Sequence, residues 1–197
     1  MASFEQRRKA VFLDLNGTLV LPIKPDRLDD LAPIPGAIAA VARLTRAGFV
    51  CPVITVQSRI AKRIFSADDF GRWFAAFADR ARSDGAELDG PYVCPHRYAD
   101  PCACKKPNPL LYERAIEDLG IATASSYVVG DSPEDMQAAN RLGIPGCLVR
   151  TGWAADPSIA DAAATDAAHI ADSIVDAVDW ILSSTVSAEI GDDGSPV

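Results

Sequence analysis

The segment that most constrains the fold is a short apolar run that ends on an acidic turn. Residues 10–13 are all apolar, and they are followed by Asp14, Asn16, Gly17 and Thr18. An apolar run of this length is typical of a strand that is buried on both faces of a parallel sheet. Because α/β proteins bind their ligands at the carboxyl ends of such strands, we expect Asp14 to lie at a ligand site.

The rest of the chain alternates between strand-like apolar runs and helical segments. Ser66 and Asp69 form a capping-box pattern, and Asn108 is the expected N-cap of a helix that begins at Pro109. The alternation predicts an α/β fold, a three-layer sandwich around a mainly parallel, Rossmann-like sheet of five or six strands. The expected strands cover residues 10–15, 49–55, 91–94, 127–129, 146–149 and 168–170, and the expected helices cover 36–47, 67–82, 109–119, 132–143, 158–164 and 172–184.

The length and the loops predict a single domain. A chain of 197 residues is long enough for one full hydrophobic core. We assign residues 1–185 to this domain and residues 186–197, which are polar and aperiodic, to a disordered tail. The Pro-rich loop 19–35 and the segment 56–66 are too short to form a cap domain. The active site is therefore expected to be open.

Charge and hydropathy exclude two classes of partner. The net charge of -8 argues against a nucleic-acid-binding surface, which is normally basic. No apolar run is long enough to predict a membrane span, and the polar N-terminus has no signal-peptide segment behind it. We expect a cytoplasmic protein whose partner is a small phosphorylated molecule.

Four polar residues follow or flank successive predicted strands. They are Asp14, Thr55, Lys106 and Asp131. An aspartate can attack phosphorus to give an aspartyl-phosphate, and two carboxylates, from Asp14 and Asp131, suit Mg²⁺. The lysine can neutralise charge on the phosphoryl group, and the Thr55 hydroxyl and the backbone N–H of Val56 can hydrogen-bond its oxygens. The set predicts phosphoryl-transfer chemistry.

One carboxylate near this set has an alternative interpretation. Asp135 follows Ser132 by three residues, so it fits the first turn of a helix as well as it fits the active site. The same alternative applies less strongly to Asp131. The order of the whole set, with Gly130 before Asp131, favours the catalytic interpretation.

A group of cysteine and histidine residues predicts a second metal site. Cys94-Pro-His96 and Cys102-Ala-Cys104 provide three thiolates and one imidazole, which match a closed tetrahedral zinc site. Because four protein ligands leave no open position, the zinc should be structural, and it should fix the loop that presents Lys105 and Lys106. The alternative is a loop of free thiols with a surface histidine.

The two motif sets together resemble the zinc-loop, capless branch of the haloacid dehalogenase superfamily. The closest resemblance is to D-glycero-D-manno-heptose 1,7-bisphosphate phosphatases, and a more distant one is to histidinol-phosphate phosphatases. It extends from Val11 to Gly152. The resemblance implies that Asp14 is the nucleophile, that Mg²⁺ is bound by Asp14, the backbone carbonyl of Asn16 and Asp131, and that Thr55 and Lys106 contact phosphate.

The departures from the family pattern lie around the substrate. The family has Asp-Arg-Asp-Gly where this chain has Asp14-Leu-Asn-Gly, and Thr-Asn-Gln-Ser-Gly where this chain has Thr55-Val-Gln-Ser-Arg. It has Arg at the place of Lys105. Arg59, Lys62 and Arg63 are either a site for a second anionic group or a solvated basic cluster. The expected substrate-binding residues are Thr55, Val56, Gln57, Ser58, Arg59, Lys105 and Lys106.

Asn16 replaces the aspartate that the family uses for proton transfer. An amide can neither protonate a leaving group nor deprotonate water, which costs roughly 10²–10⁴ in rate. Three hypotheses follow: an engineered trap of a phosphatase, a natural enzyme with another proton-transfer group or an activated substrate, and a non-catalytic protein that binds Mg²⁺ and a phosphometabolite. The preferred prediction is a Mg²⁺-dependent sugar-phosphate phosphatase with Asp14, Asn16, Thr55 and Lys106 in its catalytic centre, and histidinol phosphate is the rival substrate.

Overall fold

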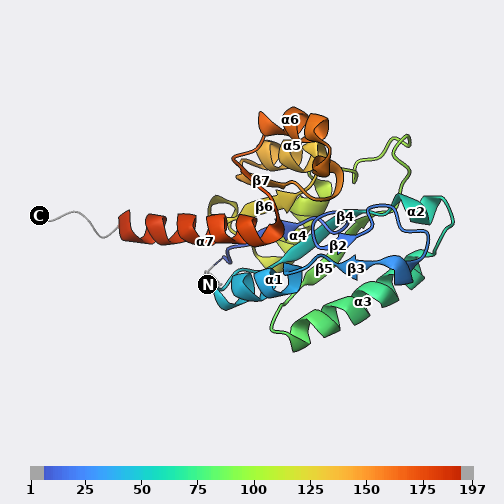
Figure 1. Ribbon diagram of the computed structural model, residues 1–197, viewed down its shortest axis with the longest axis horizontal. Coiled ribbons are helices and arrows are strands. Elements are labelled where there is room, and N and C mark those ends of the chain that lie inside the picture. Colours follow the sequence, from blue (N-terminus) through green and yellow to red (C-terminus); the bar gives the residue numbers. More distant parts are fainter. Residues whose placement is uncertain (1–6, 192–197) are drawn as a thin grey trace, which may run out of the picture.

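The fold is built around one parallel sheet. The computed structural model of the chain describes residues 7–191 and contains six parallel strands in the order β5-β4-β1-β6-β7-β8 (Figure 1). This confirms the predicted α/β class and the larger of the two predicted strand numbers. The strands are β1 (Val11–Leu13), β4 (Pro52–Val56), β5 (Asp89–Cys94), β6 (Tyr127–Gly130), β7 (Gly146–Val149) and β8 (His169–Ala171).

Strand β1, which precedes Asp14, lies near the middle of the sheet. In β1, Leu13 is paired with Val53 of β4 on one side and with Val129 of β6 on the other. All three residues of β1 are completely buried, as the apolar run predicted. This register brings the carboxyl ends of β1, β4 and β6 to the same edge of the sheet.

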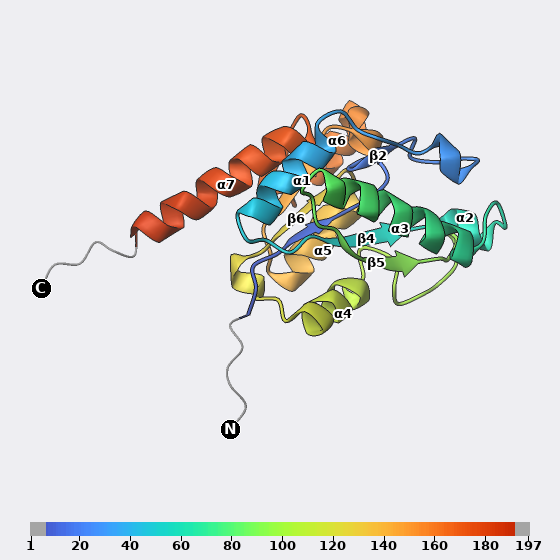
Figure 2. The ribbon, with the colours of Figure 1, turned by 90° about the horizontal axis from the view of Figure 1, so that it is seen from below.

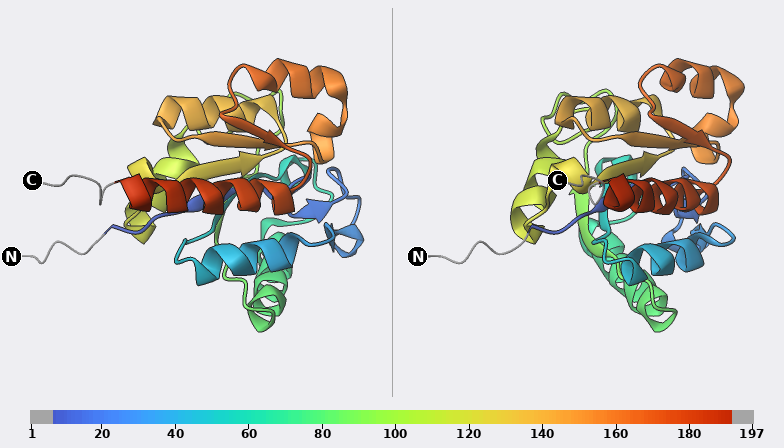
Figure 3. Two further views of the ribbon diagram at one scale, coloured as in Figure 1. Left: turned by 60° about the vertical axis from the view of Figure 1, so that its left-hand side comes forward. Right: turned by 90° about the vertical axis from the view of Figure 1, so that its left-hand side faces the viewer.

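Helices cover both faces of the sheet and complete the predicted three layers. α1, α3 and α7 pack on one face, and α4, α5 and α6 pack on the other (Figures 2 and 3). On α7, Ile174, Val178 and Ile181 recur at helical spacing and are fully buried. The helices are α1 (Ala37–Arg46), α3 (Ala67–Ser83), α4 (Leu110–Leu119), α5 (Pro133–Leu142), α6 (Pro157–Ala164) and α7 (Ile174–Gly191).

The two segments predicted to be too short for a cap domain contain only short elements. The Pro-rich loop forms a two-stranded antiparallel sheet from β2 (Val20–Leu21) and β3 (Ala32–Pro33), followed along the chain by α1. Residues 22–26, here called the strap, leave β2 and run beside the carboxyl edge of the central sheet. The segment after β4 contains the short helix α2 (Ser58–Ala61).

Two local predictions need correction. The last helix extends to Gly191, so residues 186–191 of the predicted tail are helical, and residues 192–197 lie outside the described residues. Asn108 does not cap α4, because its side-chain amide donates instead to the carbonyl oxygen of Cys102 (3.1 Å). The capping box of Ser66 and Asp69 is present as predicted. In the described part of the chain, none of the helices combines the length and apolarity that a bilayer crossing requires.

Candidate active site

Three strand ends and one loop converge on a single pocket. Asp14 follows β1, Thr55 lies near the end of β4, Asp131 follows β6, and Lys106 comes from the loop between β5 and α4. All four side chains line one pocket with a volume of about 420 Å³. The structure therefore brings together the residues that the strand order placed at one edge.

The Lys106 ammonium group lies between two carboxylates. Its Nζ is 2.6 Å from Oδ1 of Asp14 and 2.7 Å from Oδ1 of Asp135. Burial alone would lower the pKa of Lys106, but the charges of Asp135 and Asp14 outweigh it and raise this pKa well above its usual value. Lys106 is therefore a permanent cation. Asp135 therefore has two roles. It pairs with Lys106, and in the first turn of its helix it accepts a hydrogen bond from the Ser132 hydroxyl (2.6 Å).

The two carboxylates expected to bind a metal hold their protons more strongly than usual. Burial raises the pKa of Asp14 to about 6, against the opposing effect of Lys106. Burial, followed by the charges of Asp14 and Asp135, raises the pKa of Asp131 to about 9. Three carboxylates around one ammonium group leave an excess of buried negative charge. A divalent cation would remove that excess.

Backbone groups enclose the Asp131 carboxylate closely. Its Oδ2 accepts a hydrogen bond from the backbone N–H of Trp153 (2.6 Å). A β-carbon on either Gly17 or Gly152 would overlap this oxygen, and both residues have positive φ angles. Glycine is thus required at these two positions for the turns after β1 and β7 to approach the carboxylate.

Asn16 is held by hydrogen bonds at both ends of its amide. Its Oδ1 accepts from the side-chain amide of Gln57 (2.6 Å), and its Nδ2 donates to the carbonyl oxygen of Pro22 (3.3 Å). Gln57 also donates to the Thr55 hydroxyl (2.9 Å), which leaves the hydroxyl hydrogen of Thr55 available for a ligand. None of these partners of Asn16 titrates near neutral pH.

The predicted substrate-binding residues divide into two groups. Val56, Ser58 and Arg59 line the pocket together with Thr55 and Lys106. Gln57 is buried, does not line the pocket, and orients Asn16 and Thr55. Lys105 is also outside the pocket lining, because its ammonium group donates to backbone carbonyl oxygens of the loop before it. The placement of Lys105 in the substrate site is therefore not borne out by the geometry.

Several pocket residues were not predicted from the sequence, among them Trp153, Lys24 and Tyr98. Trp153 follows β7, Lys24 belongs to the strap, and Tyr98 lies between the predicted zinc ligands. The Lys24 ammonium group lies 4.2 Å from the centre of the Trp153 ring. The position of Trp153 just after a strand end was a usable signal. Lys24 and Tyr98 lie in irregular loops, where sequence periodicity provides none.

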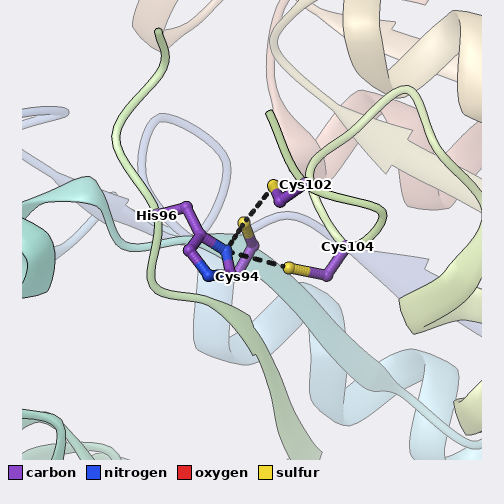
Figure 4. Close-up of side chains that lie close together, drawn as sticks. All are labelled: Cys94, His96, Cys102 and Cys104. Atoms are coloured by element: carbon purple, nitrogen blue, oxygen red, sulfur yellow. Dashed lines mark hydrogen bonds between the residues drawn. The ribbon is translucent and has the colours of Figure 1, made fainter. Parts of the chain in front are cut away.

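The four predicted zinc ligands converge at the end of β5. The ligand atoms of Cys94, His96, Cys102 and Cys104 all lie within 4.8 Å of one another (Figure 4). The Sγ atoms of Cys94 and Cys102 are 3.7 Å apart, which is close to the edge of a tetrahedron with metal–sulfur bonds of about 2.3 Å. The Cys104 Sγ lies 3.3 Å from Nδ1 of His96. This arrangement can hold a metal ion, as the spacing of the two motifs predicted.

Comparisons with known proteins agree with the geometry. The HAD-hydrolase-like family model matches residues 103–177. The D-glycero-beta-D-manno-heptose-1,7-bisphosphate 7-phosphatase of Haemophilus ducreyi is 39% identical over 158 residues, which cover 75% of this chain and 86% of that protein. The chain belongs to the haloacid dehalogenase-like phosphatases. The protein of the same name from Yersinia pestis is 36% identical to this phosphatase over 188 residues, with coverage of 89% and 90%.

A solved structure extends the likeness to three dimensions. The D,D-heptose 1,7-bisphosphate phosphatase from B. bronchiseptica, crystallised with magnesium and phosphate, matches this phosphatase with a TM-score of 0.78 and 26% identity. The match covers 89% of this chain and 99% of that one. The family resemblance inferred from the motifs is confirmed, and the chain is a phosphoric monoester hydrolase of the haloacid dehalogenase type.

Proposed function

We propose that this phosphatase removes a phosphoryl group from a phosphorylated sugar of the heptose-bisphosphate type, with Mg²⁺ as cofactor and Asp14 as nucleophile. The observation that carries the proposal is the buried group of Asp14, Lys106 and Asp131 around one pocket. The names of the relatives from H. ducreyi and Y. pestis support the choice of sugar.

The residues at the pocket fit a magnesium ion. Asp14 and Asp131 would hold it through carboxylate oxygens, and Asn16 through its backbone carbonyl, which are the hard oxygen ligands that Mg²⁺ prefers. The raised pKa values of Asp14 and Asp131 support this assignment, because they express the cost of burying these carboxylates without a cation. When bound, the ion withdraws charge from the phosphoryl oxygens.

The chain's own groups perform the two chemical steps. A carboxylate oxygen of Asp14 attacks phosphorus, the ester P–O bond breaks, and the leaving group departs with the bonding electrons. Water then attacks the phosphorus of the aspartyl-phosphate, which releases phosphate and restores the Asp14 carboxylate. Lys106 balances the charge of the phosphoryl group, and the Thr55 hydroxyl donates a hydrogen bond to it. Both groups already line the pocket.

Asn16 limits which substrates react quickly. Its side-chain amide is hydrogen-bonded to Gln57 and to the carbonyl oxygen of Pro22. An amide provides neither a proton for the leaving group nor a base for the water. Loss of general acid–base help costs roughly 10²–10⁴ in rate. Substrates with a more acidic leaving group, such as an anomeric phosphate, are therefore slowed less than alkyl phosphates are.

A phosphate-release assay tests the proposal. We expect the unsubstituted protein to release phosphate from heptose 1,7-bisphosphate in a Mg²⁺-dependent reaction, and Asp14→Asn to abolish it. Asn16→Asp should increase the rate on alkyl phosphates by roughly 10²–10⁴. Faster release from histidinol phosphate would assign the rival substrate. Binding of the bisphosphate without turnover, both in the unsubstituted protein and in the Asn16→Asp variant, would instead indicate a binding protein.

We also propose Zn²⁺ as the occupant of the Cys94, His96, Cys102 and Cys104 site. Three thiolates and one imidazole form a ligand set that zinc takes up in closed, structural sites. The convergence of these four side chains at the end of β5 supports this choice. The bound ion would stabilise the loop that leads to Lys106.

A further inference from the structure

The Lys105 ammonium group is fully occupied by main-chain oxygens. Its Nζ donates hydrogen bonds to the carbonyl oxygens of Arg97 (3.2 Å), Tyr98 (2.5 Å) and Asp100 (2.8 Å). An ammonium group has three hydrogens, so these bonds use all of its donors. A substrate phosphate could be bound by Lys105 only if some of these bonds were lost. In this fold Lys105 holds residues 97–100 in place through these three hydrogen bonds.

Other contacts fix the same turn. The backbone N–H of Arg97 donates to the carboxylate of Asp100 (3.1 Å), and the Arg97 guanidinium group donates to the carbonyl oxygen of Ala61 (3.4 Å). His96 and Cys102, which belong to the candidate zinc site, flank the turn on either side. Ordering an exposed turn costs conformational entropy at every residue. A turn held at this many points is therefore expected to position a side chain.

Tyr98 is the side chain that the turn presents to the active site. It lines the same pocket as Asp14 and Lys106. It is 55% exposed, the highest value among the large apolar side chains of residues 7–185 that remain exposed. An aromatic side chain that remains more than half exposed adds little of its area to the buried core, and beside a pocket it offers both an apolar face and a hydroxyl group to a ligand.

We propose that Tyr98 contacts the sugar part of the phosphorylated substrate, and that Lys105 is a positioning residue that holds Tyr98 at the pocket. This rests on the proposed phosphatase function of the same site. The ring suits the role because its face can cover the C–H groups of a sugar while its hydroxyl group exchanges hydrogen bonds with sugar hydroxyls. Lys105 acts through Tyr98 and does not touch the substrate.

The contact with the sugar can be measured as a ratio. Phosphate release is assayed with heptose 1,7-bisphosphate and with acetyl phosphate, which carries a phosphoryl group without a sugar. The ratio is kcat/KM for heptose 1,7-bisphosphate divided by kcat/KM for acetyl phosphate. We expect Tyr98→Ala to lower this ratio about tenfold, chiefly through a higher KM for the sugar phosphate, and Tyr98→Phe to keep most of it. Ile64→Ala, which truncates an exposed apolar side chain outside the pocket, is the matched control. An unchanged ratio in Tyr98→Ala would overturn the proposal.

The positioning role of Lys105 needs a double-mutant cycle. We expect Lys105→Met to lower this ratio by about as much as Tyr98→Ala does. The double variant should show no further fall, because both substitutions remove the same contact between Tyr98 and the sugar. Lys105→Arg, which keeps donors for the three carbonyl oxygens, should restore most of the ratio. Independent, additive losses would show that Lys105 binds the substrate itself and would overturn this part of the proposal.

Two measurements separate this inference from the proposed function. If Asp14→Asn abolishes phosphate release while the Tyr98 variants leave the ratio unchanged, the phosphatase function stands and the inference fails. If there is no Asp14-dependent turnover, the phosphatase function fails, and titration calorimetry with heptose 1,7-bisphosphate still tests the contact. Binding about tenfold weaker in Tyr98→Ala than in the unsubstituted protein supports the inference, and equal binding overturns it.

Discussion

At the scale of single residues, the active site depends on the balance between one ammonium group and three carboxylates. Lys106 is almost fully buried and is paired with both Asp14 and Asp135. Removing it would leave two buried carboxylates without a cationic partner, whereas removing the Asp135 charge leaves Lys106 and Asp14 as a neutral pair. Loss of one partner of a buried ion pair typically costs about 3–5 kcal/mol.

We therefore predict that Lys106→Met destabilises the magnesium-free protein at pH 8 by about 3–5 kcal/mol. Asp135→Asn should cost less than half as much, because Asp14 still neutralises the ammonium group. The free energy of unfolding in urea measures both effects. A larger loss in Asp135→Asn than in Lys106→Met would contradict this account of the charge balance.

Single residues also show the limits of sequence reasoning. Asp14, Thr55 and Asp131 could be placed because each is attached to a strand end, and parallel strands fix where their ends lie. Lys105 could not be placed, since a lysine beside a catalytic lysine gives the same sequence pattern whether its ammonium group faces a phosphate or three carbonyl oxygens. That difference depends on the path of the loop, and the sequence of the loop has no periodicity.

At the scale of elements, the strap is held in place by contacts with Arg59 and with Trp153. Arg59, from α2, donates to the carbonyl oxygen of Lys24 (2.9 Å) and contacts the exposed carboxylate of Asp26 (3.3 Å). The Lys24 side chain lies over Trp153. The Nε of Arg59 is buried and has no hydrogen-bond partner, which is unusual for a charged donor in a pocket wall. Arg59 also lines the pocket, and the exposed part of its guanidinium group is therefore placed to meet an anionic group of the substrate.

This predicts that Arg59 recognises a second charge on the substrate. Glucose 6-phosphate and 6-phosphogluconate share one carbon skeleton and one 6-phosphate, and only 6-phosphogluconate carries a charge at C1. We expect kcat/KM to be about tenfold higher for 6-phosphogluconate, in line with one hydrogen bond to a charged group. Arg59→Gln should remove the difference, since Gln keeps a donor for Lys24 but has no charge.

Arg63→Gln is the matched control, because Arg63 belongs to the same turn but does not line the pocket. If Arg59→Gln and Arg63→Gln have equal effects, the basic group acts as a solvated cluster. A preference for charged substrates that survives in Arg59→Gln would likewise exclude a direct contact.

The loop with the four candidate zinc ligands supports a separate prediction. We expect about one zinc ion per chain by mass spectrometry, because a closed tetrahedral site holds a single ion. Cys104→Ser should lose that ion and melt at a lower temperature. Cys147→Ser should keep it, since Cys147 is buried in β7, away from the loop. Zinc retained in Cys104→Ser would exclude this ligand set.

The elements themselves were predictable to different degrees. β1 and β6 were found because a buried strand needs an apolar run, and α7 was found from its apolar face. The β2–β3 pair was missed because each strand has only two residues, too few for any periodicity to be visible. The predicted last helix ends at residue 184 and α7 ends at Gly191, because a polar and aperiodic segment can still continue a helix.

At the scale of the whole molecule, the buried carboxylates link stability to pH. In the folded, magnesium-free protein the pKa values of Asp14 and Asp131 are raised to about 6 and about 9, above the ordinary value of 3.8 for the unfolded chain. Between these limits the folded state holds more protons than the unfolded state does. The contribution of these groups to the free energy of unfolding therefore falls as the pH rises, by about 1.4 kcal/mol per pH unit for each extra proton held.

We predict that urea denaturation without magnesium shows decreasing stability from pH 5 to pH 9, and that added Mg²⁺ reverses much of this loss at the alkaline end. The ion needs deprotonated ligands, so its stabilising effect should be small at pH 5 and large at pH 8. Asp131→Asn should weaken both the pH dependence and the response to Mg²⁺, because one amide replaces the carboxylate with the most strongly raised pKa. Stability that rises with pH in the magnesium-free protein would mean that these carboxylates are already neutralised by groups of the chain, and a metal would then have no electrostatic reason to bind between residues 14 and 131.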